Sequence, residues 1–219
     1  MDISAIERYV PLYVEAAKLT LTLGGVGIVL AVLVGFICAM IRYYKIPIAK
    51  QVVGAYIELS RNTPLLIQLF FLYYGLPKLG VKISAETCAV IGLTFLGGSY
   101  MAEAFRSGLE AVSKSQIESG LSIGLNEWQL IQHVILPQAF AVAMPGIGAN
   151  IIFLLKETSI FSAVALADLM FVAKDLIGMY YKTDEALFLL VIAYLIILLP
   201  LSILFTWIER RMRYAGFGN

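Results

Sequence analysis

The sequence has little charge, little cysteine and almost no histidine. Of its 219 residues, 14% are charged, two are cysteines and one is a histidine, whereas 60% are apolar. The mean hydropathy is +0.87. So little charge excludes a soluble domain and indicates a polytopic membrane protein. The formal net charge of +1 gives no reason to expect a nucleic-acid partner.

Several kinds of chemical site are also missing. Cys38 and Cys88 lie in apolar segments without ligand spacing, which favours packing over a disulfide or a metal site. His133 has no nearby ligands, so we expect no metal site, no catalytic residues and no enzyme activity. The chain has no GxxxxGK[ST] loop and should not bind ATP in that manner. The first residues include acids and no basic n-region, so we expect no cleavable signal peptide.

Long apolar runs predict the membrane spans, because a helix needs about 20 residues to cross the hydrocarbon core. We expect an all-α fold with five spans in a single membrane domain, residues 1–219. The expected spans are residues 19–41, 58–77, 85–106, 134–155 and 186–208. Residues 160–173 are too short to span and should form a re-entrant or interfacial helix.

The second expected span must include charged residues to be long enough. Glu58 and Arg61 lie three apart, hence on one helix face, where they can pair. An ionisable pair at membrane depth suggests a functional site. The alternative is that both side chains snorkel to the headgroup boundary. Pro64 should kink or loosen this helix.

Two other spans carry features of interest. Glu103 and Arg106 repeat the three-residue acid–base spacing at the end of the third span. Pro137 and Pro145 should break the fourth span, and a span interrupted in this way suits a protein-lined cavity.

Lysine and arginine predict the orientation. With five spans, most basic residues fall on one side of the membrane, which should be the cytoplasm. The N-terminus should then lie outside and the C-terminus in the cytoplasm. The residues of this basic side are Arg42, Lys45, Lys50, Arg106, Lys114, Arg210, Arg211 and Arg213.

Residues 116–137 form the longest polar interval between two apolar regions. The stretch predicts a short helix with Glu118 near its start, where the helix dipole favours an acid. Gly124 should break the chain between this helix and a second one over residues 126–133. By spacing alone, an ordinary cytoplasmic loop is an equally good reading.

Three segments carry a resemblance to a known family. The coupling loop of bacterial ABC-importer permeases has the pattern Glu-Ala-Ala, three residues, Gly, nine residues, Ile-x-Leu-Pro. This chain has Glu118-Ser119-Gly120, Gly124 and Val134-Ile135-Leu136-Pro137 at the same spacing. Residues 58–71 resemble the Arg-Gly-Thr-Pro-Leu-Leu-(Val/Ile)-Gln segment of the polar-amino-acid branch, with Asn62 in place of Gly. A third similar segment covers residues 136–169.

The resemblance implies the type I ABC-importer permease fold, with a cytoplasmic coupling loop, residues 109–133, between spans three and four. Its implied coupling residues are Glu118, Ser119, Gly120, Gly124 and Pro137. The implied partners are an ATPase dimer that holds ATP and Mg, a second permease copy or a paralogue, and an extracytoplasmic amino-acid-binding protein. The chain itself would carry no cofactor and would lie, in contact with lipid, in the bacterial plasma (inner) membrane.

An imported amino acid is a zwitterion and needs both donors and acceptors inside the membrane. The candidate pathway residues are Gln68, Ser99, Tyr100, Asn150, Glu58 and Arg61. For each of the uncharged ones, an interhelical hydrogen bond is the alternative role. Relatives that handle basic amino acids often carry an acid near Asn150, so its neutral amide favours acidic or neutral polar substrates. The competing function is an ATP-independent secondary transporter, but the charges near the spans lie toward their ends.

Overall fold

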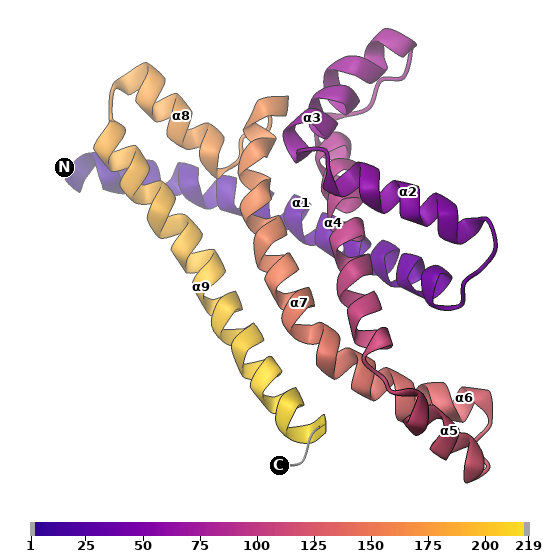
Figure 1. Cartoon of the computed structure of the whole chain (residues 1–219). Coiled ribbons are helices and arrows are strands. Elements are labelled where there is room, and N and C mark those ends of the chain that lie inside the picture. Colours follow the sequence, from indigo (N-terminus) through magenta and orange to yellow (C-terminus); the bar gives the residue numbers. More distant parts are fainter. Residues whose placement is uncertain (1–2, 217–219) are drawn as a thin grey trace.

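The computed structural model describes residues 3–216, and within this range the chain forms helices and no strand. The four longest helices are α1 (Ile3–Tyr43), α4 (Ala85–Glu110), α7 (Leu136–Glu157) and α9 (Thr183–Gly216). Figure 1 shows these as the long rods of the molecule. Four helical stretches of the described range are long and apolar enough to cross a membrane: Ile6–Tyr43, Ala85–Glu110, Glu127–Val164 and Thr183–Met212. The all-helical, multi-pass prediction is therefore confirmed.

The segment expected as the second span is divided. It consists of α2 (Ala49–Arg61) and α3 (Leu65–Phe70), followed by a π turn and a 3₁₀ turn that end at Leu79. The prediction of one helix over residues 58–77 is wrong, because Pro64 has no N–H to donate and disfavours helical backbone in the residue before it. The Gln68 Nε2 donates to the carbonyls of Ser60 (3.2 Å) and Thr63 (2.9 Å), so the side chain bonds to carbonyls at the break.

The fourth span is more regular than its prolines suggest. A short helix, α6 (Glu127–Leu130), continues through a π turn at Ile131–Ile135 directly into α7. Pro137 lies just after the π turn and Pro145 lies inside α7, and neither proline ends the helix. The predicted breaks at both prolines are therefore wrong. α7 packs closely against α4: at Gly108 of α4, an added Cβ would lie 2.2 Å from the Ala139 carbonyl oxygen.

Close helix packing positions α4 at the centre of the molecule. α4 lies against both α1 and α7. At Gly35 of α1, an added Cβ would lie 2.3 Å from the Met101 Cβ, so the two backbones meet there with no room for a side chain. Leu93, Met101 and Leu154 are completely buried in the core that these three helices enclose. Small residues at helix contacts allow such approach in membrane proteins.

The segment after α7 also differs from its prediction. A 3₁₀ helix (Thr158–Val164) ends at the left-handed Ala165 (φ 61°), and α8 (Leu169–Tyr180) begins after Asp168. Asp168 Oδ1 accepts a hydrogen bond from the Phe171 N–H (2.9 Å) and caps α8. The predicted helix over residues 160–173 is therefore wrong, because this left-handed turn and this cap divide it.

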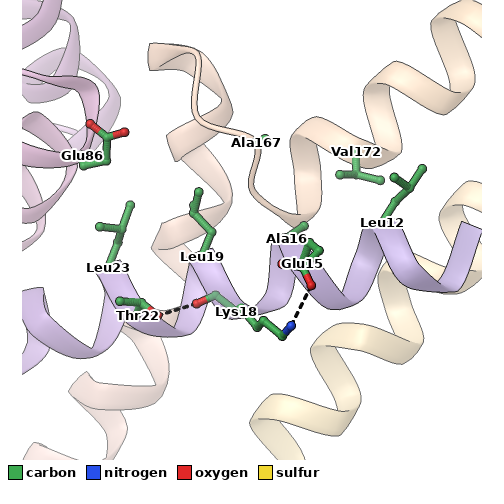
Figure 2. Close-up of a pocket in the computed structure, with 10 residues that line it drawn as sticks. All are labelled: Leu12, Glu15, Ala16, Lys18, Leu19, Thr22, Leu23, Glu86, Ala167 and Val172. Atoms are coloured by element: carbon green, nitrogen blue, oxygen red, sulfur yellow. Dashed lines mark hydrogen bonds and ion pairs between the residues drawn. The ribbon is translucent and has the colours of Figure 1, made fainter.

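A groove of about 530 Å³ runs between α1 and the segment that leads into α8. Figure 2 shows Leu12, Ala16 and Leu19 on its α1 wall, with Ala167 and Val172 opposite. The Glu15–Lys18 ion pair lies at its edge, and both of these side chains are largely exposed. The groove is thus an open, mostly apolar surface feature.

Candidate functional site: an arginine–glutamate cluster and a projecting helical hairpin

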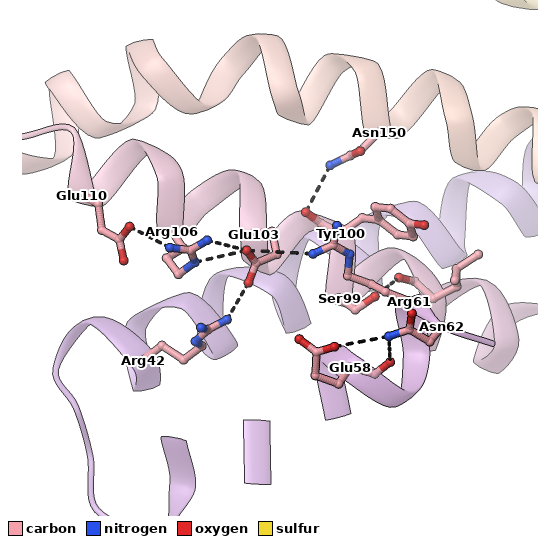
Figure 3. Close-up of polar contacts among 11 residues, drawn as sticks. Arg42, Glu58, Arg61, Asn62, Ser99, Tyr100, Glu103, Arg106, Glu110 and Asn150 are labelled. Atoms are coloured by element: carbon pink, nitrogen blue, oxygen red, sulfur yellow. Dashed lines mark hydrogen bonds and ion pairs between the residues drawn. The ribbon is translucent and has the colours of Figure 1, made fainter. Parts of the chain in front are cut away.

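Three arginines from three helices meet around Glu103 of α4. Arg42 Nη1 of α1 lies 2.5 Å from Glu103 Oε1. Arg106 donates to the other oxygen, Oε2, from Nη2 (2.6 Å) and Nε (3.2 Å). Arg61 Nη1 of α2 lies 4.0 Å from the same oxygen (Figure 3). The predicted Glu103–Arg106 proximity is confirmed, and Glu103 joins α1, α2 and α4 electrostatically.

The predicted pairing of Glu58 with Arg61 is wrong. The Arg61 guanidinium points toward Glu103 and lies over the Tyr100 ring, 5.3 Å from its centroid. Glu58 instead accepts a hydrogen bond from the Asn62 side chain (3.3 Å). Arg61 lies there because α4 packs against α2 and supplies both a carboxylate, Glu103, and an aromatic face, Tyr100. A cation is attracted to each of these groups.

The α2–α4 contact fixes where Arg61 lies. The Tyr56 hydroxyl (2.7 Å) and the Ser60 hydroxyl (2.9 Å) both donate to the Phe95 carbonyl. These two bonds join the last turns of α2 to α4. Arg61 follows directly and is therefore held beside the next turns of α4, which carry Tyr100 and Glu103.

The uncharged candidate residues fall into two groups. Ser99 is completely buried and donates to the Leu96 carbonyl (2.7 Å), and Gln68 is buried at the α2–α3 break. Tyr100 and Asn150 are half-buried, and the Asn150 Nδ2 donates to the Tyr100 carbonyl (3.2 Å), which links α7 to α4. Of the candidate residues, Tyr100 and Asn150 thus remain partly accessible, together with the charged Arg61 and Glu58.

The region after α4 forms a hairpin of two short helices. Helix α5 (Lys114–Ser122) leads to Gly124, whose φ of 87° is left-handed, and then to α6. Asn126 Oδ1 accepts from the Gln129 N–H (2.9 Å), and Gln129 Oε1 accepts from the Asn126 N–H (3.0 Å), a reciprocal capping box. The predicted helix–glycine–helix arrangement is confirmed. Glu118, however, lies in the middle of α5, because α5 begins at Lys114, two residues before the stretch in which the helix was expected.

The hairpin extends away from the rest of the bundle and exposes apolar side chains. Figure 1 shows α5 and α6 together at one end of the molecule, beyond the ends of α4 and α7. Ile123 and Trp128 are 79% and 69% exposed. Exposed large apolar side chains on a projecting element indicate a contact surface. The hairpin is held together at Gly120, where an added Cβ would lie 2.6 Å from the Leu130 Cδ1.

Sequence reasoning missed two parts of this site. In the sequence, Arg42 indicates only the orientation, and the spacing of Glu103 to Arg106 does not by itself show that Glu103 binds arginines of two other helices. The exposure of Ile123 and Trp128 was also missed, because these two residues look like ordinary apolar positions in the sequence.

These features define an integral membrane protein of the transport-permease class: four membrane-length helices, a divided second segment and a projecting hairpin. Residues 31–214 match the family described as "binding-protein-dependent transport system inner membrane component". The chain belongs to this family, and it is a transport component rather than an enzyme.

Individual relatives match over nearly the full chain. The chain is 33% identical over 214 residues to the glutamine transport system permease protein GlnP of Escherichia coli (strain K12), covering 97% of this chain and 98% of that protein. It is 36% identical over 205 residues to the probable amino-acid permease protein YxeN of Bacillus subtilis (strain 168), covering 92% of each.

Solved structures show the same fold. The chain is similar to a chain of "an amino acid ABC transporter with histidines", with a TM-score of 0.88 and 33% identity, covering 96% of this chain and 99% of that one. It also matches a chain of the MetNI methionine ABC transporter in an inward-facing conformation, with a TM-score of 0.78 and 20% identity over 94% of this chain and 98% of that one. The type I ABC-importer permease fold is therefore established for this chain.

Proposed function

We propose that this chain is the membrane-spanning subunit of an ATP-driven importer of polar amino acids, with acidic or neutral polar substrates favoured over basic ones. The observation that carries the proposal is the α5–Gly124–α6 hairpin, which projects exposed apolar side chains away from the membrane helices. A hairpin of this kind suits docking to a separate protein. The names of the relatives, which include a glutamine permease, support an amino-acid substrate.

The partners follow from the same proposal. An ATPase dimer, which holds ATP and Mg, contacts the hairpin from the cytoplasm, and this chain carries no cofactor. A second permease copy or a paralogue completes the pathway, and an extracytoplasmic binding protein delivers the amino acid. The N-terminus lies outside and the C-terminus lies in the cytoplasm of the bacterial plasma membrane.

The proposed coupling runs through continuous helix. Helix α6 passes through the π turn at Ile131–Ile135 into α7 without a flexible linker, so a displaced hairpin moves α7. α7 touches α4 at the Gly108–Ala139 contact and again through the Asn150–Tyr100 hydrogen bond. Movement of the hairpin would in this way reach the half-buried polar groups. Coupling is assigned to Glu118, Ser119, Gly120, Gly124 and Pro137.

The proposed pathway uses the polar residues near the α2–α4–α7 junction. Arg61, Tyr100 and Asn150 face the transported molecule, because their side chains are partly accessible. Gln68, Ser99 and Glu58 belong to the same region. Gln68 and Ser99 donate to its backbone carbonyls, and Glu58 accepts from the Asn62 side chain.

The test is reconstitution in proteoliposomes with the cognate ATPase and binding protein. We expect one or a few polar amino acids, presented by the binding protein, to stimulate ATP hydrolysis and uptake together. Gly124→Val should reduce stimulated uptake strongly, because valine at φ 87° distorts the hairpin. Affinity of the binding protein for its amino acid should not change. Gly178→Val, in α8 with open space around it, is the matched control and should transport normally.

Two results would contradict the proposal. Normal uptake by the Gly124→Val variant would remove the assignment of coupling to the hairpin. Uptake driven by an ion gradient without ATP would favour the secondary-transporter alternative.

A further inference from the structure

The cluster around Glu103 holds one of its arginines less firmly than the other two. Its ion pairs join three guanidinium groups, those of Arg42, Arg61 and Arg106, to two carboxylates, those of Glu103 and Glu110. The Glu58 carboxylate lies nearby and accepts a hydrogen bond from the neutral Asn62 amide, so the charges of the region are close to balanced. A guanidinium group within a membrane protein whose donors make no hydrogen bond is a candidate for binding an anion.

Arg61 is the arginine whose N–H donors remain unused among the described residues. Arg42 and Arg106 occupy the two oxygens of Glu103 at hydrogen-bond distance, and Arg106 also reaches Glu110 (2.7 Å). Arg61 lies only at 4.0 Å from Glu103, beyond hydrogen-bond range, and no hydrogen bond holds its guanidinium within residues 3–216. Its side chain is 43% exposed, against 32% for Arg42 and 31% for Arg106.

The surroundings of Arg61 orient it without using its donors. The Tyr100 ring supports the guanidinium through a cation–π contact, which leaves the N–H groups in the guanidinium plane available. Tyr100 also accepts the Asn150 Nδ2 hydrogen bond, so the amide oxygen of Asn150 is left as an acceptor beside the same residue. A planar donor group and an acceptor near one tyrosine match the two charged ends of a zwitterion.

We propose that Arg61 is the binding site for the α-carboxylate of the transported amino acid, with the Asn150 amide oxygen accepting from its α-ammonium group. This assignment rests on the proposed import function and names the part of the substrate that this region recognises. In the absence of substrate, Arg61 stays near Glu103 through electrostatic attraction and the contact with the Tyr100 ring, without a hydrogen bond. A purely structural Arg61 would instead serve only to join α2 to α4.

The experiment measures equilibrium binding to the purified permease–ATPase complex in lipid nanodiscs, without the binding protein. The probes are L-glutamine and L-glutamate, each compared with its α-carboxamide, which lacks the carboxylate. We expect the wild-type complex to bind each acid about 10- to 100-fold more tightly than the corresponding α-amide. In Arg61→Ala, affinity for the acids should fall to that for the amides, and affinity for the amides should not change.

Two further variants separate binding from folding. Arg61→Lys keeps the positive charge but lacks the planar guanidinium group with its two parallel donors. It should retain part of the preference for the acid. Lys50→Ala removes one positive charge from an exposed position of the same helix, α2, and should bind both kinds of probe as the wild type does.

The proposal is overturned if Arg61→Ala still prefers the acid. It is also overturned if a wild-type complex that is active in ATP-driven uptake does not discriminate acid from amide, or binds neither. Absence of ATP-driven uptake in the wild-type complex would instead count against the import function itself, so the two failures are distinguishable.

Discussion

At the scale of single residues, Asp168 combines a capping role with an unfavourable location. It is completely buried, its Oδ1 caps α8, and its Oδ2 has no hydrogen-bond partner within the described part of the chain. Burial raises the pKa of this carboxyl from 3.8 to about 6, although backbone N–H groups of the cap and Lys174 act in the opposite direction. The folded protein therefore binds this proton more tightly than the unfolded chain does.

Burial of Asp168 makes the folded protein less stable as the pH rises. Because the pKa is higher in the folded state, the free energy of unfolding should fall as the pH rises from about 4 to about 6, by up to about 3 kcal/mol. Asp168→Asn keeps an oxygen for the cap and loses the charge, so it should remove this fall and raise the melting temperature at neutral pH. Asp168→Ala also loses the cap and should be less stable than Asp168→Asn by about 1 kcal/mol. Melting in detergent between pH 4 and 7.5 checks this, and an Asn variant with the wild-type slope would contradict it.

Single residues also show which contacts a sequence can predict. The left-handed Gly124 was predictable, because a glycine between two short helical patterns has a local explanation. The partner of Arg61 was not predictable, because spacing within the helix favours Glu58, whereas Glu103 lies on a different helix, α4. Attraction to the Glu103 carboxylate of α4 places Arg61 away from Glu58. Residue spacing within α2 does not show which carboxylates other helices bring close.

At the scale of helices, two glycines of α1 differ sharply in their surroundings. An added Cβ at Gly35 would meet the Met101 Cβ at 2.3 Å and the Ala102 backbone nitrogen at 2.8 Å, whereas one at Gly25 would meet nothing within 4 Å. Gly35→Ala should therefore force α1 and α4 apart and cost about 2 kcal/mol or more, as overpacking does. Gly25→Ala is the matched control on the same helix, and it should be neutral or stabilise by up to about 1 kcal/mol.

Thermal unfolding of the purified protein in detergent measures both variants. Equal melting temperatures for Gly35→Ala and Gly25→Ala would show that α1 and α4 do not pack as closely as described.

The helices also show why breaks are harder to predict than spans. Hydrophobic length alone identified the four long helices, since the thickness of the membrane sets that length. Pro64 and Pro145 have the same local chemistry, yet only Pro64 lies at a break. The carbonyls at the first site bond to the Gln68 side chain, whereas α7 stays helical at Pro145 while it packs on α4. These hydrogen bonds and packing contacts are tertiary, so the local sequence around a proline does not predict them.

At the scale of the whole molecule, one chain leaves extensive apolar surface uncovered. Along α9, Ile196 and Ile203 are 68% and 61% exposed, and along α1 Val29 and Ile37 are 60% and 57% exposed. Lipid covers part of such a surface in any membrane protein, so exposure alone does not identify a subunit contact. Arg61, Tyr100 and Asn150 are also partly accessible in the single chain, which is expected if a second subunit completes the pathway.

We therefore predict that transport requires two permease chains, each docked to one ATPase. Co-reconstitution of wild-type chains with the uncoupled Gly124→Val chains tests this, because the outcome depends on how many intact copies one transporter needs. If every transporter contains two copies of this chain and needs both, an equal mixture should retain about a quarter of the wild-type uptake. If one chain acts alone, the mixture should retain about half. If the second subunit is a paralogue, this chain and the ATPase should show no uptake until that paralogue is added. Native mass spectrometry of the active complex gives the subunit count independently, and an active complex with one permease chain would refute the prediction.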